Sequence, residues 1–203
     1  MVANINYTPK WMSEADYLAS ELERDTKHEY IDGYIYAMSG VSKNHQRITA
    51  NIDRVFGNYF KNKSCESFAS EVKIKVGSKF FYPDVMLVCQ DNDQDYYTET
   101  PVIIVEVLSK STRKIDETIK KIAYQSIPTL EEYVLVEQDF VDVEVCRRRE
   151  SWASSHYFLG DSVAFESVGL TISVEDMYAR VDNEDVHAFF AQTEISTLNR
   201  ELF

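Results

Sequence analysis

Two carboxylates interrupt two strongly apolar segments of this chain, and that pattern limits what the chain can fold into. Asp84 stands within residues 81–88, and Glu106 stands within residues 101–108. Both segments are rich in aromatic and β-branched residues and are bounded by turn formers, which predicts buried central strands. A charge buried in such a strand is costly unless it is paired, so both carboxylates need a partner.

The connection between the two segments predicts how the carboxylates meet. We expect the strands to pair antiparallel through the polar residues 89–100, with Val88 opposite Val102. The same register places Asp84 opposite Glu106. Directly opposed side chains lie on one face with Cβ atoms about 5 Å apart, where like charges repel. A divalent cation resolves the repulsion, and oxygen ligands favour Mg²⁺ or Mn²⁺ over zinc.

Length and composition indicate one globular unit. At 203 residues the chain is long enough for one core, so we expect a single domain over residues 1–203. The residues beyond 182 are acidic and weakly patterned, so we expect a tail at 182–203. The sequence has neither the apolar core of a signal peptide nor a membrane-length run, which predicts a cytoplasmic protein with no membrane partner.

The spacing of the three cysteines bears on zinc binding and on disulfide pairing. Cys65, Cys89 and Cys146 are odd in number, far apart and form no Cys-x-x-Cys pair. This spacing argues against a zinc site or a disulfide framework and predicts free, mostly buried thiols.

The formal net charge of −13 argues against non-specific DNA binding by the chain as a whole. Basic residues nevertheless gather in residues 41–63 and 108–121. The basic residues that we expect to bind nucleic-acid phosphates are Lys43, Arg47, Lys110, Arg113 and Lys114. The alternative is that these residues form ordinary solvated helix faces.

Hydrophobic periodicity and turn signals predict an α/β (α+β) fold, a three-layer domain with a mixed sheet. Expected helices cover residues 13–23, 43–61, 112–124 and 174–179. Expected strands cover residues 66–68, 71–76, 80–88, 101–108, 132–136, and a meander at 142–148, 152–159 and 163–165. Asp32-Gly33 predicts a hairpin turn between strands at 27–31 and 34–38.

Several ordered motifs, taken together, are much more specific than any one of them. They are Lys27-His-Glu-Tyr-Ile-Asp-Gly33, Tyr82-Pro-Asp-Val85, residues 101–112, Asp116-x-x-x-Lys120-x-x-x-Tyr124 and Glu132-Tyr-Val-Leu-Val136. Through these motifs the chain resembles the Uma-type family of restriction endonuclease-like proteins. That family is abundant in cyanobacteria and belongs to the PD-(D/E)XK nuclease superfamily. The resemblance covers about residues 11–180.

The resemblance implies a restriction-endonuclease-like core, a homodimer, and a set of site residues. Asp84 and Glu106 match the metal-binding acids of the superfamily, and Glu29 adds an acid from the N-terminal region. The lysine that the superfamily carries two residues after the second acid is replaced by Leu108. Lys120 occupies the family's own lysine position on the following helix, with Lys73 and Lys75 as second choices.

The predicted function is a metal-dependent endonuclease acting on DNA. Asp84, Glu106 and the Val107 carbonyl would hold Mg²⁺ or Mn²⁺, and Lys120 and Glu29 would complete the catalytic set. One alternative is a catalytically weak or inactive dimeric module that binds nucleic acid or protein, which the missing strand lysine and the acidic composition favour. Another is a hydrolase of small phosphorylated substrates.

Each site residue also has a purely structural interpretation. Asp84 could be a turn residue, Glu106 an exposed edge residue, and Glu29 a solvated or lysine-bridged glutamate. The remaining candidates have similar alternatives: a helical ion pair for Asp116 with Lys120, core packing for Tyr124 and a surface or capping role for His45.

Overall fold

The computed structural model describes residues 11–90, 94–110 and 112–201. Residues 1–10 of the predicted domain lie outside the described residues. The helices are α1 (Glu14–Glu21), α2 (Lys43–Phe60), α3 (Arg113–Ile115), α4 (Lys121–Gln125), α5 (Val174–Met177) and α6 (Glu184–Glu201), with a π-helical segment η1 (Asp116–Lys120) and a 3₁₀ turn η2 (Arg148–Glu150). The strands are β1 (His28–Ile31), β2 (Tyr34–Ala37), β3 (Glu66–Ala69), β4 (Lys73–Val76), β5 (Lys79–Phe81), β6 (Val85–Val88), β7 (Tyr97–Thr98), β8 (Pro101–Leu108), β9 (Glu132–Glu137), β10 (Val143–Arg147), β11 (Ser154–Tyr157), β12 (Ser162–Phe165) and β13 (Leu170–Ser173).

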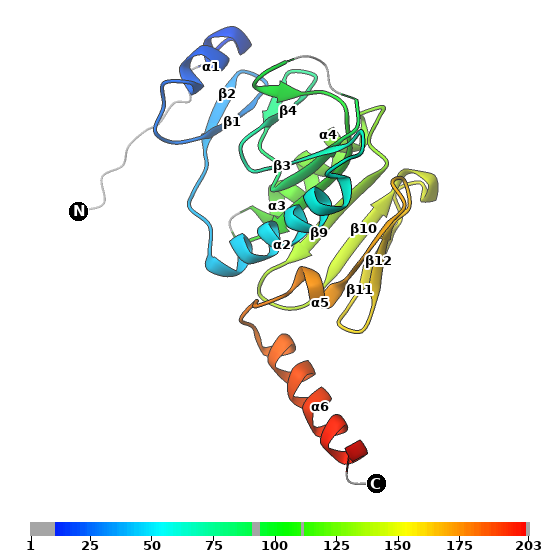
Figure 1. Ribbon diagram of the computed structural model, residues 1–203. Coiled ribbons are helices and arrows are strands. Elements are labelled where there is room, and N and C mark those ends of the chain that lie inside the picture. The colour runs from blue at the N-terminus through cyan, green and yellow to red at the C-terminus, as the bar shows by residue number, and fades with distance from the viewer. Residues whose placement is uncertain (1–10, 91–93, 111, 202–203) are drawn as a thin grey trace, which may run out of the picture.

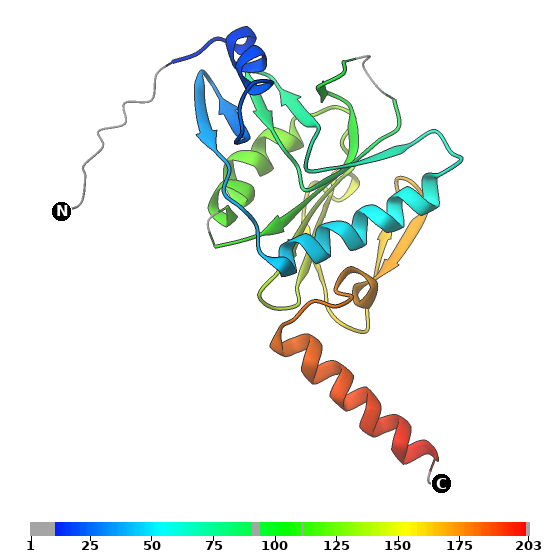
Figure 2. The same cartoon turned by 60° about the vertical axis from the view of Figure 1, so that its left-hand side comes forward.

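A six-stranded mixed sheet, ordered β11-β10-β9-β8-β6-β3, forms the centre of the fold. β8 pairs antiparallel with β6 and parallel with β9, so the predicted mixed α+β architecture is confirmed. Helix α2 covers one face of this sheet and α4 lies on the other (Figures 1 and 2). Because side chains alternate along a strand, Val105 and Val107 pack in the core under α2. Ile104 and Leu108 pack in the other core, with Tyr124 of α4.

A second sheet, ordered β2-β1-β5-β4-β7, carries the N-terminal hairpin. Asp32 and Gly33 both have positive φ, as the predicted two-residue hairpin turn requires. Tyr17 of α1 packs on Tyr30 and Phe80 of this sheet, and its hydroxyl donates to the His28 carbonyl at 2.6 Å. Ser13 is the N-cap of α1, because its side chain accepts from the Asp16 amide. This packing holds α1 against the sheet that contains the hairpin.

The segment expected as one strand over residues 80–88 is divided into two strands in two different sheets. The chain leaves β5 at Phe81 and enters β6 at Val85, passing through Pro83, which lacks an N–H for a sheet ladder. The expected three-strand meander is also incorrect, because β12 pairs with β13 in a separate two-stranded sheet instead of with β11.

The expectation of three free cysteines is wrong for two of them. β3 pairs with β6 so that Glu66 lies opposite Val88, which brings the next residues, Cys65 and Cys89, together. They form a disulfide, and Cys146 is free and buried.

The C-terminal segment beyond residue 182 forms a helix, α6, although its weak hydrophobic pattern did not predict one. α6 extends away from the two sheets in both views (Figures 1 and 2). Its first turn is attached to the body, since Asp185 accepts from the Val141 amide at 2.8 Å and Val186 is buried. Among the described residues, none of the helices combines the length and hydrophobicity needed to cross a membrane.

Candidate active site

The acids and the lysine singled out in the sequence line one cavity of about 310 Å³. They come from four elements: Glu29 from β1, Asp84 from the bend before β6, Glu106 from β8, and Asp116 with Lys120 from η1. The cavity is also lined by the segment from Tyr36 to Ser42, by His45, and by Ser109, Thr112 and Gln138. Residues as far apart in the sequence as Glu29 and Gln138 thus share one site.

The predicted register is confirmed over most of the β6–β8 pair. Val85 lies opposite Val105, and the next two residues of β6 follow the same register. A shift after Leu87 places Val88 opposite Pro101 instead of Val102, so the predicted pairing is wrong at that end. Asp84 precedes Val85, and Glu106 follows Val105, so the two acids adjoin the same end of the paired segment.

Asp84 is not inside a strand, as the sequence analysis expected, but its carboxylate is still held at the sheet. Its Oδ2 accepts a hydrogen bond from the Val107 amide of β8 at 2.7 Å. His45 Nε2 lies 3.2 Å from the same oxygen. The side chain of Asp84 is 16% exposed and faces the cavity. It is therefore joined to the neighbouring strand and does not close a local turn of its own.

Glu106 is buried at the centre of the sheet, which rules out the interpretation as an exposed edge residue. β8 lies between β6 and β9, and only 2% of the Glu106 residue surface is exposed. Its Oε1 accepts hydrogen bonds from Lys120 Nζ at 3.2 Å and from the Tyr124 hydroxyl at 2.9 Å. Tyr124 is a core residue, as expected, and in addition orients this carboxylate.

The Lys120 ammonium lies among three carboxylates. Its Nζ is 2.9 Å from Glu29, 3.2 Å from Glu106 and 3.1 Å from Asp116. The predicted helical pair of Asp116 with Lys120 is present, but both side chains are buried and do not form a solvated face. Glu29 forms an ion pair with Lys120, as the interpretation of a lysine-bridged glutamate expected, and it also lines the cavity.

Burial and crowding of acids dominate the electrostatics. Burial raises the pKa of the Glu106 carboxyl well above its ordinary value; Lys120 opposes this rise, and Asp116, Asp84 and Glu29 add to it. Burial alone would lower the pKa of Lys120, but the surrounding carboxylates outweigh it and raise that pKa well above its ordinary value. Three carboxylates therefore contact the single ammonium of Lys120, and burial disfavours the charged form of one of them, Glu106.

The fit of the site to a metal ion depends on which ligands are counted. Among the described residues, no three His, Cys, Asp or Glu side chains are grouped so that they could hold a metal ion. Three of the acids instead surround Lys120. The predicted ligand set contains only two side chains, Asp84 and Glu106, with the Val107 carbonyl. The absence of a group of three side chains therefore does not exclude this set. Its oxygen-only donors fit a hard divalent cation.

Sequence reasoning underrated His45. Its backbone amide donates to the Ser42 side chain, which caps α2, and this places the ring in the first turn, facing Asp84. The residue is 5% exposed, so it is neither a surface group nor a cap. A histidine three residues after an N-cap serine was the available signal, but only the tertiary packing reveals its contact with the acid.

The five expected phosphate-binding residues differ in whether their side chains already have partners within the protein. Arg113 forms a bidentate ion pair with Glu137, and Arg47 donates to Asn44 at 2.9 Å. Lys43, Lys110 and Lys114 are exposed and form no ion pair within the described part of the chain. Lys43 and Lys110 directly follow residues that line the cavity, and Lys114 directly precedes Ile115, which also lines it, so all three adjoin its mouth.

The two second-choice lysines lie elsewhere. Lys75 pairs with Glu14 at 3.1 Å, and the Lys73 ammonium lies 5.1 Å from the centre of the Tyr82 ring. Neither lines the acidic cavity. Leu108, at the usual lysine position, is buried in the apolar core beside Tyr124.

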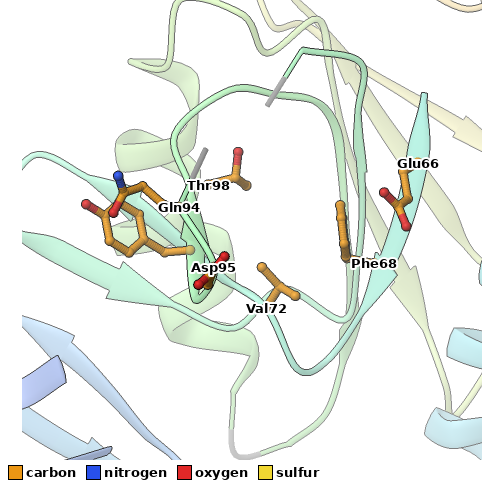
Figure 3. A pocket seen from close by; sticks show the side chains of 7 residues that line it. Glu66, Phe68, Val72, Gln94, Asp95 and Thr98 are labelled. Atoms are coloured by element: carbon orange, nitrogen blue, oxygen red, sulfur yellow. The ribbon is translucent and has the colours of Figure 1, made fainter. Parts of the chain in front are cut away.

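A larger cavity of about 430 Å³ lies between β3 and the segment 94–98 (Figure 3). Figure 3 shows Glu66 and Phe68 on one side of it and Gln94 on the other. Among the described residues that line it there are two acids, Glu66 and Asp95, and no lysine or arginine. It therefore offers no cation for a phosphate and does not compete with the acidic cavity as a nuclease site.

A mixed sheet with helices on both faces and an acid-lined cavity at paired strands characterises restriction-endonuclease-like proteins. The same fold occurs in the crystal structure of an Anabaena variabilis protein described as "a putative nuclease belonging to DUF820". The two structures have a TM-score of 0.65 and 17% sequence identity, covering 83% of this chain and 98% of that chain. At this identity the likeness concerns the fold.

The chain belongs to the Uma2 family, described as "Putative restriction endonuclease", whose sequence model matches residues 14–175. The resemblance drawn from the motifs is thus confirmed. Two relatives come from Synechocystis sp. The uncharacterized protein slr1290 is 34% identical over 173 residues, covering 82% of this chain and 91% of the relative. The uncharacterized protein sll1609 is 35% identical over 144 residues, covering 68% and 81%.

Proposed function

We propose that this protein is a divalent-metal-dependent endonuclease that hydrolyses DNA phosphodiester bonds. The observation that carries the proposal is the acidic cavity: Asp84 and Glu106 adjoin the same end of two paired strands and line one cavity with Lys120. Such a combination of acids and a cation is suited to phosphoryl chemistry, in which catalysis is largely positioning and charge stabilisation. The family assignment supports a nuclease-like role.

Asp84, Glu106 and the Val107 carbonyl are the groups proposed to hold Mg²⁺ or Mn²⁺. The Val107 amide donates to Asp84, and in an antiparallel pair the N–H and C=O of one residue face the same neighbour. The carbonyl therefore faces the side of β8 on which Asp84 lies. When bound, the ion supplies activation of water and stabilises the charge that develops on the phosphate.

Lys120 is proposed to supply the cationic role that Leu108 leaves empty. Its ammonium reaches the same sheet face as Glu106 from the helical layer, and Glu29 and Asp116 fix its position. A fixed ammonium next to the reacting phosphate stabilises transition-state charge without reorganisation at the moment of reaction. Glu29 then acts through Lys120, as a positioning residue.

The exposed lysines at the mouth are proposed to place the DNA backbone. Lys43, Lys110 and Lys114 are available for phosphates, whereas Arg47 and Arg113 are already engaged and should contribute less. A homodimer, with one cavity in each protomer, is part of the proposal.

Cleavage of DNA tests this function. Single-stranded and duplex DNA are incubated with Mg²⁺ or Mn²⁺ and wild type, Glu106→Gln or the control Glu117→Gln, whose side chain is exposed and lies outside the cavity. We expect cleavage by wild type and the control, and a loss of about a hundredfold or more in Glu106→Gln. A folded wild-type protein that cuts neither substrate, while a reference nuclease does, would contradict the proposal.

A second candidate function, a catalytically inactive binding module, is favoured by one observation: Lys120 is already neutralised by three carboxylates. In that case the cluster would be structural. DNA or protein binding that is unchanged by a chelator and by Glu106→Gln, with no cleavage, would support this second function over the first.

A further inference from the structure

The acidic cavity has two chemically different walls. One wall carries the acids and Lys120. The other is formed by β2 and the segment after it, where Tyr36, Ala37, Met38 and Val41 line the cavity. Tyr36 is 49% exposed and Val41 is 55% exposed, so this apolar wall is open to solvent. Phosphodiester chemistry alone does not require such a wall.

Tyr36 lies immediately beside the ion cluster. It is paired with Glu29 across the β1–β2 ladder, and directly opposed residues have their side chains on the same face. Glu29 is in turn 2.9 Å from Lys120. The phenol ring therefore lies beside Glu29, which contacts Lys120. At this separation a nucleotide could stack its base on the ring while its own phosphate lies at the ion cluster.

The size of the cavity restricts what can enter it. At about 310 Å³ it is at the small end of the range of about 300–1,000 Å³ for ligand pockets. One nucleotide suits this volume, but a base pair within a stacked duplex does not, because its base faces are covered by neighbouring pairs. An exposed aromatic ring can bind only a base face that is unpaired and unstacked.

The net charge of the chain also favours a single strand over a duplex. With a formal net charge of −13 and three unpaired lysines near the mouth, electrostatic attraction to a duplex backbone is weak. Base stacking on an aromatic side chain adds affinity that does not depend on net charge. An acidic protein can therefore bind a single strand where it cannot bind a duplex well.

We infer that Tyr36 is a stacking platform for an unpaired base, and that the substrate is single-stranded or locally unpaired DNA whose phosphate lies at the Glu106–Lys120 cluster. This inference rests on the proposed nuclease function for the position of the phosphate. The stacking itself can be measured by binding alone.

The test measures the affinity of a fluorescent single-stranded oligonucleotide carrying 2-aminopurine, and of the same strand annealed into a blunt duplex, with Ca²⁺ present. The variants are Tyr36→Ala, Tyr36→Phe and the control Phe158→Ala, which removes an aromatic ring that is 51% exposed but outside the cavity. We expect tighter binding of the single strand, a loss of roughly tenfold in Tyr36→Ala, and near wild-type binding in Tyr36→Phe and the control.

The outcomes separate this inference from the nuclease function. Equal affinity for strand and duplex, an unchanged Tyr36→Ala, or no binding of either form would overturn the inference. Cleavage of the duplex that is unchanged by Tyr36→Ala would support the nuclease proposal and overturn the stacking. Tyr36-dependent binding of single strands without any cleavage in Mg²⁺ or Mn²⁺ would support the stacking and overturn the nuclease.

Discussion

At the scale of single residues, the proposed site takes its positive charge from Lys120 instead of from the strand position of Leu108. Leu108 shares a sheet face with Glu106, but it is buried in the apolar core. The ammonium comes instead from Lys120, one layer away, and contacts the same carboxylate. Because the location of the charge matters more than the element that carries it, the helix can supply what the strand lacks.

Replacing Lys120 with methionine should strongly destabilise the protein. The substitution leaves Glu29, Glu106 and Asp116 buried without their cation, and removing one partner of a buried ion pair typically costs about 3–5 kcal/mol. Chemical denaturation at neutral pH measures the change in the free energy of unfolding. The exposed, unpaired Lys114→Met should change it by less than about 0.5 kcal/mol. Equal effects of the two substitutions would show that Lys120 is not buried among acids.

At the scale of elements, the N-terminal hairpin carries both Glu29 and Tyr36, so its turn controls the geometry of the cavity. Gly33 has φ +98°, and a Cβ atom added there would lie 2.2 Å from Trp11 Nε1. The Met12 amide also donates to the Gly33 carbonyl at 2.9 Å. The turn is thus packed against the segment that leads into α1.

Gly33→Ala should destabilise more than Gly160→Ala, which has the same φ but open space around it. The control should cost about 1 kcal/mol or more from its backbone conformation alone. The additional cost of Gly33→Ala comes from displacing the indole of Trp11, so it should disappear when both glycine substitutions are compared in a Trp11→Ala background. Thermal or chemical denaturation of the four variants measures this difference, and an excess that persists without the indole would refute the explanation.

How much the sequence predicts differs from element to element. The hairpin turn, α2, and the register of β6 with β8 could be predicted because each depends on local turn chemistry or alternation. The pairing of Asp84 with Glu106 at one cavity followed from that register. The choice of Lys120 as the ammonium near Glu106 also followed, but from the family resemblance and not from spacing.

Features that depend on tertiary packing could not be predicted. The π-helical segment η1 carries both Asp116 and Lys120, and periodicity suggested only an ordinary helix there. The contact of His45 with Asp84 requires the first turn of α2 to meet the bend before β6. The Cys65–Cys89 disulfide depends on the pairing of β3 with β6, which no cysteine spacing reveals.

At the scale of the whole molecule, net charge limits how nucleic acid can be bound. A chain of net charge −13 with three available lysines near the cavity should bind DNA with a shallow salt dependence. For a single strand, three phosphate contacts predict a slope of about −2 for log K against log salt concentration. Fluorescence anisotropy over a salt series measures that slope. A slope steeper than about −5 would require many more phosphate contacts than these three lysines provide.

We propose above all that Asp84 and Glu106 form a divalent-metal site. Calorimetric titration of Mn²⁺ into wild type and into the double variant Asp84→Asn with Glu106→Gln tests it directly, because both substitutions preserve shape and remove charge. The same titration of Glu117→Gln, an exposed acid outside the cavity, controls for surface binding. We predict saturable binding by wild type and by the control, and none by the double variant while it remains folded. Equal binding by all three proteins, or binding by none, would contradict the claim.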